Sequence, residues 1–350
     1  MLFITLLTYA TFIRFGLASY VLEDDYGTTD FFDNFDFYTG TDPTNGFVDY
    51  VDQSTAESTG LISTGSTVYM GADHTNVASS SGRESVRISS TKTYNHGLFI
   101  LDLSHMPGNA CGSWPAFWLL GLPTWPDDGE IDIIEGINSQ IGNDMTLHTS
   151  SGCSITNSGD FTGTEYSSDC YGGDNDNTGC QIQGSTNTAT YGDDFNSAGG
   201  GVYATEWTSD VIQIWFFESG SIPSDITSGS PVPSGWGTPL AKFSLSCDID
   251  SHFIDMEIVF DITFCGDWAG QSSIWSSDST CSALDSSCDD YVMNNPSAFE
   301  STYWTINSLK VYSDSTSYKR EVMGNNGTVA HGNMRRHLRP QYHRRQGGFF

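Results

Sequence analysis

The chain has 350 residues and a formal net charge of −30, with 16% charged and 13% aromatic side chains. This surplus of acidic residues argues against nucleic-acid binding, which requires a basic surface. The length allows one large β-rich domain with a buried core, and the 37 glycines suit a fold with many turns.

Residues 1–19 resemble a secretory signal. The segment Leu2 to Leu7 is mostly apolar, and Gly16-Leu17-Ala18 suits a cleavage site. Arg14 is atypical of such a signal, and a buried N-terminal strand is the alternative. No other stretch approaches the ~20 apolar residues of a membrane span, so none is predicted. We therefore expect a secreted, extracellular protein.

The C-terminal residues 315–350 differ in charge from the rest of the chain. They hold seven of the 13 basic residues and one of the 43 acidic residues, and so carry +6 while the remainder carries −36. This composition predicts a flexible, disordered tail. The predicted division is a signal at 1–19, one domain at 20–314 and a basic tail at 315–350.

Eight cysteines form an even set, which in a secreted protein is consistent with up to four disulfides. Their pairing stays open, because eight cysteines allow about 105 connectivities. No two cysteines have the C-x-x-C spacing, so structural zinc is not expected.

Many segments alternate apolar and polar residues with the period of a β-strand, at spacings of about ten residues. The predicted strands cover residues 31–37, 47–51, 84–88, 97–103, 116–120, 130–135, 145–149, 212–217, 254–264 and 304–312. Long amphipathic helices and internal repeats are absent. This pattern predicts an all-β fold, a two-sheet antiparallel β-sandwich.

Two segments are expected to be irregular or helical. Residues 150–200 are rich in Ser, Gly, Asn, Asp and Thr and contain three cysteines, which favours loops held by disulfides rather than a separate domain. Ser297 and Glu300, which follow Pro296, match the spacing of a capping box and predict one short helix.

The stretch Glu130-Ile131-Asp132-Ile133-Ile134-Glu135 is the centre of the functional prediction. In a regular strand Glu130 and Asp132 share a face, and Glu135 points to the opposite one. One extra residue, a β-bulge near Ile133 or Ile134, would bring Glu135 back into phase. All three carboxylates would then line one face.

Three carboxylates on one face repel one another, which separates their pKa values. Cleavage of a glycosidic bond requires this separation, because one carboxyl must hold a proton while another stays ionised. The alternatives are a solvated strand edge, or a calcium-dependent adhesion module that uses the acidic turn Asp127-Asp128.

The six-residue stretch resembles the signature of glycoside hydrolase family 16 in its bulged, laminarinase-like form. The resemblance extends from about residue 24 to residue 313. Over this range the chain is similar to fungal laminarinase-type endoglucanases of the family. Its further motifs are Asp42-Pro43-Thr44-Asn45-Gly46, Ser113-Trp114-Pro115-Ala116-Phe117-Trp118, Met145-Thr146-Leu147-His148-Thr149, Glu206-Trp207-Thr208 and Phe264-Cys265-Gly266-Asp267-Trp268-Ala269-Gly270.

The resemblance implies a jelly roll with a concave substrate cleft. It implies that Glu130 is the nucleophile, Glu135 the general acid/base and Asp132 an assisting carboxylate. It also implies that His148 lies near the carboxylates. It further implies that Trp114, Trp118 and Trp268 line the sugar subsites, and Asn45 is a weaker candidate for substrate binding.

Physical arguments support some of these roles. Flat aromatic rings suit the apolar faces of glucose, and Trp114 and Trp118, four residues apart, share a face of an extended strand. His148 is expected to hydrogen-bond Asp132 or Glu130, although a structural role is the alternative. For Asn45, a turn-forming role is an adequate explanation.

We therefore predict a secreted, retaining endo-β-glucanase that hydrolyses 1,3- or mixed 1,3/1,4-β-glucan as a monomer, without cofactor or metal. A β-glucan transglycosylase, in which a sugar replaces water as acceptor, is the near alternative. A non-catalytic β-glucan-binding lectin on the same sandwich is the alternative from another class of protein.

Overall fold

The computed structural model describes residues 20–156, 159–173 and 177–314. The predicted signal at 1–19 and the predicted basic tail at 315–350 lie outside the described residues. In the part that is described, no helix is both long and apolar enough to cross a membrane.

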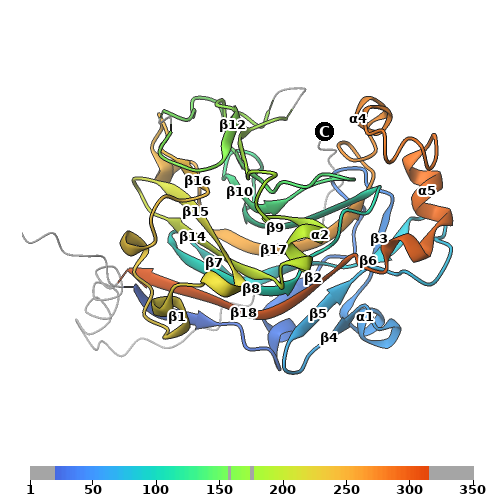
Figure 1. Ribbon diagram of the computed structural model, residues 1–350, viewed down its shortest axis with the longest axis horizontal. Helices are drawn as coiled ribbons and strands as arrows, with labels where there is room; N and C mark the ends of the chain where they lie inside the picture. Colours follow the sequence, from blue (N-terminus) through green and yellow to red (C-terminus); the bar gives the residue numbers. More distant parts are fainter. Residues whose placement is uncertain (1–19, 157–158, 174–176, 315–350) are drawn as a thin grey trace, which may run out of the picture.

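Two eight-stranded antiparallel sheets form the body of the molecule, and Figure 1 shows the strands around β9 and β17 stacked on those around β8 and β18. The first sheet has the order β16 (Ala241–Phe243), β15 (Ile212–Glu218), β14 (Gly201–Trp207), β8 (Gly97–His105), β18 (Tyr303–Asp314), β5 (Val68–Gly71) and β4 (Ile62–Ser63), and β1 (Tyr20–Asp25) also pairs with β18.

The second sheet carries the predicted functional stretch. Its order is β12 (Thr164–Ser167), β13 (Cys180–Gln183), β11 (Asp144–His148), β10 (Glu130–Glu135), β9 (Ser113–Gly121), β17 (Met256–Phe264), β7 (Arg87–Tyr94) and β2 (Phe35–Phe37). A small parallel pair joins β3 (Val48–Tyr50) to β6 (Arg83–Ser85). The predicted two-sheet antiparallel β-sandwich is confirmed.

The helices that the structure describes are short. The α-helices are α1 (Gln53–Thr59), α2 (Gly192–Ser197), α3 (Ser224–Thr227), α4 (Ser272–Ser277) and α5 (Cys288–Asn294). The 3-10 helices are η1 (Phe31–Asn34), η2 (Ser219–Ser221), η3 (Pro233–Gly235), η4 (Ile249–Ser251) and η5 (Pro296–Phe299).

The core lies between the two sheets and is rich in aromatic rings. Phe260 in β17 is fully buried, and its ring lies 4.6 Å from that of Phe117 in β9 and 5.8 Å from that of Trp304 in β18, centroid to centroid. Burial of one such side chain stabilises a fold by about 1.5–3 kcal/mol. This packing joins the two sheets across the sandwich.

Two local predictions are wrong in part. The strand predicted for residues 31–37 begins only at Phe35, because residues 31–34 form η1, which places the neighbouring side chains of Phe31 and Phe32 both in the core. An extended strand would direct one of these two rings to each face.

The helix predicted at Ser297 is the four-residue η5, which no side-chain cap stabilises. The segment 150–200 is irregular for most of its length, as predicted. It also contains β12 and β13, which extend the second sheet, and the helix α2.

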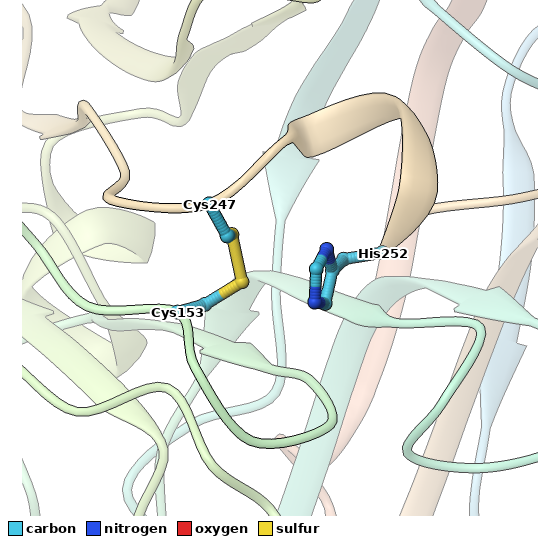
Figure 2. A group of neighbouring side chains, drawn as sticks. All are labelled: Cys153, Cys247 and His252. Carbon is cyan, nitrogen blue, oxygen red and sulfur yellow. A yellow bond between two sulfur atoms is a disulfide. The ribbon is translucent and has the colours of Figure 1, made fainter.

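All eight cysteines are paired, as Cys111–Cys281, Cys153–Cys247, Cys170–Cys180 and Cys265–Cys288. The prediction of up to four disulfides is confirmed, and the fold decides the pairing that the sequence left open. Cys153–Cys247 attaches the loop after β11 to the segment after β16, and Figure 2 shows the imidazole of His252 beside this disulfide.

Candidate active site

A β-bulge interrupts β10 where the sequence predicts one. Against β9, Asp132 lies opposite Trp118 and Ile134 opposite Phe117, so that β10 contains one extra residue. Against β11 the register also shifts by one residue between Asp132 and Glu135. After the extra residue the side chains alternate in the opposite phase, so Glu135 lies on the same face as Glu130 and Asp132, as the sequence predicts.

The bulge sends its two isoleucines to the core and the carboxylates to the other side. Ile133 and Ile134 are both fully buried in the main hydrophobic cluster, whereas Glu130 and Glu135 are half-buried. We use the name carboxylate face for the outer face of the second sheet that carries Glu130, Asp132 and Glu135. A regular strand would turn Ile134 away from the core, so desolvation of Ile134 stabilises the bulged register by about 1.5–3 kcal/mol.

Each of the two glutamates accepts a hydrogen bond from a tryptophan indole. Trp114 Nε1 donates to Glu135 Oε1 at 2.8 Å, and Trp125 Nε1 donates to Glu130 Oε2 at 2.8 Å. Trp114 was among the predicted binding residues, but Trp125 was not. The sequence feature that could have identified Trp125 is its position between two prolines in the segment that leads into β10. At 36% exposure it also presents aromatic surface to solvent.

Trp118 lies on the carboxylate face together with Trp114, as their spacing predicts. Its Nε1 donates to Asp261 Oδ1 at 3.2 Å, and the guanidinium of Arg87 lies 5.0 Å from the centre of its ring. Asp261 in β17 is opposite Arg87 in β7. These contacts hold the indole of Trp118, which is only 9% exposed.

Sequence reasoning missed Asp261 and Arg87 as residues of this site. The available signal was the alternation of β17, which places Asp261 on the side opposite Phe260 and Ile262. Tyr50 also donates a hydrogen bond to Asp261, at 3.3 Å. Burial raises the pKa of Asp261 to about 6, although the charge of Arg87 lowers it.

His148 in β11 lies opposite Glu130, so the predicted neighbourhood is confirmed. Its Nε2 is 3.5 Å from Asp132 Oδ2 and 3.8 Å from Glu130 Oε1, which is longer than an ordinary hydrogen bond. Burial lowers the pKa of His148 to about 4, although a hydrogen bond with Asn177 raises it. The imidazole is therefore neutral over most of the pH range and adds no positive charge to the site.

Trp268 and Asn45 lie further from the carboxylates. The Trp268 ring meets that of Trp114 edge to face, at 5.5 Å between centroids. Asn45 is exposed, has a positive φ of 57°, and donates to both oxygens of Asp267 at 2.9 and 3.1 Å. Trp268 thus joins the site through Trp114, whereas the contacts of Asn45 are those of a turn that fixes the loop before Trp268.

The three carboxyl groups titrate far from their ordinary range. Burial raises the pKa of Glu130 to about 7, against the hydrogen bond from Trp125 and the charge of Arg87, which lower it. Burial and the charge of Glu130 raise the pKa of Glu135 to about 8, against the hydrogen bond from Trp114, which lowers it. Burial and the charges of Glu130 and Glu135 raise the pKa of Asp132 well above its usual value. Burial therefore raises the pKa values of all three carboxyl groups, and repulsion among their charges opposes ionisation of all three at once.

Three groups in the described residues bring potential metal ligands within 4.8 Å of one another. Two of them consist partly of disulfide-bonded cysteines, such as Cys153 and Cys247 beside His252 (Figure 2), and a disulfide offers no thiolate to a metal. The third group, Glu130, Asp132 and His148, coincides with the predicted catalytic residues.

Residues 35–312 match the family described as an XgeA-like, catalytic GH16 domain. Over 317 residues the chain is 47% identical to an endo-1,3(4)-β-glucanase of Arthroderma benhamiae, an alignment that covers 89% of this chain and 69% of that protein. The chain spans only 40–48% of the length of further fungal relatives.

Two solved structures resemble this fold over most of the chain. Laminarinase 16A from Phanerochaete chrysosporium, with 6-O-glucosyl-laminaritriose in both donor and acceptor sites, is 45% identical with a TM-score of 0.79 and covers 85% of this chain and 100% of its own. An elongating GH family 16 β-1,3-glucosyltransferase is 48% identical with a TM-score of 0.78, over 84% of this chain and 100% of its own.

Proposed function

The chain belongs to glycoside hydrolase family 16, and from this premise we propose that it is a retaining endo-β-glucanase that acts on 1,3- or mixed 1,3/1,4-β-glucan. One observation carries the proposal: the bulge in β10 places Glu130, Asp132 and Glu135 on one face, and each glutamate accepts an indole N–H. The raised pKa values of both glutamates suit a pair in which one carboxyl holds a proton while the other is ionised.

In the first step a carboxylate oxygen of Glu130 attacks the anomeric carbon of a glucose unit. The bond from this carbon to the glycosidic oxygen breaks, and Glu135 transfers its proton to that oxygen. The products are a glucan chain with a new hydroxyl group and a glycosyl ester on Glu130. This step requires Glu130 as the anion and Glu135 as the acid, and repulsion between the two buried carboxyl groups favours states in which only one of them is ionised.

In the second step Glu135, now ionised, accepts a proton from water as the water oxygen attacks the anomeric carbon. The ester bond to Glu130 breaks, and its carboxylate is restored. Two inversions at one carbon give a product with the original β configuration. The raised pKa of Asp132, which burial and the charges of the two glutamates cause, favours its neutral form while the ester forms.

Transglycosylation is the second candidate activity, in which a glucan hydroxyl replaces water in the second step. The similarity to a β-1,3-glucosyltransferase favours it as a side reaction of the same site. A non-catalytic lectin is the remaining alternative. The retention of both glutamates, each with its own hydrogen-bond donor, supports an enzyme over a lectin.

We further propose that the substrate is a neutral polysaccharide held by aromatic rings, and that the protein is secreted and monomeric. The half-buried rings of Trp114 and Trp268 and the exposed ring of Trp125 supply the apolar surface that a glucose ring requires. Four disulfides favour an oxidising compartment. The net charge of −30 argues against nucleic acid as a partner.

The test is release of reducing ends from laminarin, lichenan, cellulose and agar under the same conditions. We expect cleavage of laminarin or lichenan to shorter chains, with β-configured ends in the first NMR spectra. Products longer than a laminari-oligosaccharide substrate would show transglycosylation. Binding of laminarin without any cleavage would support the lectin and refute the enzyme.

A further inference from the structure

A fourth carboxylate, Asp144, lies directly opposite the proposed acid/base. In the pairing of β10 with β11, Glu135 is opposite Asp144, just as Asp132 is opposite Thr146 and Glu130 opposite His148. Opposed residues in antiparallel strands project to the same side, with Cβ atoms about 4.5–5.5 Å apart. Asp144 therefore lies on the carboxylate face, next to Glu135, and it is only 2% exposed.

Two glutamine amides hold the carboxylate of Asp144. Gln183 Nε2 donates to Oδ1 at 2.8 Å, and Gln140 Nε2 donates to Oδ2 at 2.9 Å. No ion pair to Asp144 is found among the described residues. Burial raises the pKa of Asp144 to about 6, although the bonds from Gln183 and Gln140 lower it. Above that pH the chain maintains a buried negative charge beside Glu135 without a cation to neutralise it.

Such an arrangement costs stability, because a buried charge without a counter-ion is poorly solvated, and the two opposed carboxylates repel once Glu135 also ionises. An asparagine has one acceptor oxygen in place of two, so it would keep only one of these two bonds unless the amide of Gln183 turned over, since Gln140 Nε2 also donates to the carbonyl oxygen of Gly142 at 2.7 Å. The two amide donors account for two acceptor oxygens at this position, and the register of the strands places the negative charge of those oxygens directly opposite Glu135.

We propose that Asp144 is a positioning residue that acts through Glu135, where its negative charge keeps the transferable proton on the acid/base. This inference rests on the proposed function. In the first step the charge opposes early loss of the proton to solvent. In the second step it strengthens Glu135 as the base that deprotonates water.

Other groups also face Glu135 and set its affinity for the proton. They are Glu130 and Asp132 on β10, Trp114 on β9, Asp261 on β17 and Tyr191, which precedes α2 and whose ring packs against Gly136. Among the acids, Glu130 becomes neutral when it forms the glycosyl ester. Asp144 takes no part in covalent chemistry, so its charge is the same in both steps.

The experiment compares Asp144→Asn with the unchanged full-length chain over a range of pH. One substrate is a reduced laminari-oligosaccharide, whose leaving group requires a proton. The other is a 2,4-dinitrophenyl β-laminaribioside, whose leaving group requires none. The basic limb of kcat/KM reports loss of the proton from Glu135, and only the first substrate depends on that proton in the bond-breaking step.

With the oligosaccharide we expect the basic limb of Asp144→Asn to move to lower pH by about one unit, within the range that a neighbouring charge shifts a carboxyl. The ratio of variant to unchanged kcat/KM should then fall about tenfold from pH 6 to the alkaline side. With the dinitrophenyl substrate the alkaline side should not change. Asp144→Glu, which restores the charge, should return the limb toward its original position.

A basic limb that does not move, or an equal loss at every pH with both substrates, would overturn the inference and leave Asp144 a structural residue. If Asp144→Asn does not fold, Asp144→Ser removes the same charge and must give the same shift. An unchanged chain that cleaves neither substrate would overturn the proposed function and the inference together. If the unchanged chain is active but the basic limb of kcat/KM does not move in the variants, the inference is overturned and the proposed function stands.

Discussion

The indole Nε1 of Trp125 donates a 2.8 Å hydrogen bond to Oε2 of Glu130. The bond links the loop before β10 to the first carboxylate of that strand, five residues later in the chain. A hydrogen bond to an ionised group stabilises the ionised form, and this one lowers the pKa of Glu130 against the effect of burial. The loop therefore helps to determine the pH at which the proposed nucleophile becomes active.

Replacement of Trp125 tests this role. Trp125→Phe removes the N–H and retains an aromatic ring, so the pKa of Glu130 should rise and the acidic limb of kcat/KM should move to higher pH. Loss of a hydrogen bond to a charged group costs about 1.5–3 kcal/mol, or about 10–150-fold in kcat/KM below the optimum. Trp125→Ala, which also removes the stacking surface, should in addition raise KM.

A matched control for Trp125→Phe is Trp236→Phe. Trp236 Nε1 donates to the carboxylate of Asp225, and the ring packs on the apolar cluster of the first sheet, away from the carboxylate face. This variant should leave both limbs of the pH profile in place. If Trp125→Phe also leaves them in place, the hydrogen bond has no influence on the nucleophile.

The pH dependence of hydrolysis should be bell-shaped. Activity rises as Glu130 ionises and falls as Glu135 loses its proton, and both pKa values are raised above the usual glutamate value of about 4.3. Both limbs of kcat/KM for an oligosaccharide should therefore lie above the range of unperturbed carboxyl groups. Stopped assays in overlapping buffers measure them, and a profile centred near pH 4 would contradict the burial of this pair.

The same shifts predict that the acid/base destabilises the fold at neutral pH. In the folded protein Glu135 keeps its proton at pH values where it has lost it in the unfolded protein. The free energy of unfolding therefore falls as pH rises from about 4.3 to about 8. Glu135→Gln has no such titration and retains an acceptor for Trp114. We expect it to be more stable than the unchanged chain by about 1–3 kcal/mol at pH 8.

Thermal unfolding at pH 4 and pH 8 measures this difference. The gain of Glu135→Gln should disappear at pH 4, where Glu135 is protonated in both states. Asp210→Asn, at an exposed carboxyl, is the control and should show no comparable pH-dependent gain. Equal stability of Glu135→Gln and the unchanged chain at pH 8 would show that Glu135 ionises there without cost.

Azide distinguishes the two glutamates by stereochemistry. In Glu130→Gly the vacated space admits azide, which attacks an activated β-glucosyl donor once and should give the α-glycosyl azide. In Glu135→Ala the nucleophile remains and forms the glycosyl ester, which azide releases as the β-azide. NMR of the anomeric proton identifies each product. A β-azide from Glu130→Gly or an α-azide from Glu135→Ala would exchange the two proposed roles.

The sequence alone predicts the central feature of the site. A strand has a period of two, and five residues separate Glu130 from Glu135, so the two cannot share a face unless the strand contains an extra residue. The same periodicity places Trp114 and Trp118 together on one face. These inferences depend only on the backbone geometry within a single strand. Residues adjacent in the sequence determine that geometry.

Only the tertiary structure decides which residues from other strands surround this stretch. Asp144 is opposite Glu135, and Asp261 is under Trp118, because of the registers of β11 and β17, which follow from packing of the whole core. The disulfide pairing and the turn of η1 depend on the same long-range packing. The perturbed pKa values also depend on the tertiary structure. Burial and the charges of residues on several strands produce them, and neither burial nor these charges can be read from a local pattern of residues.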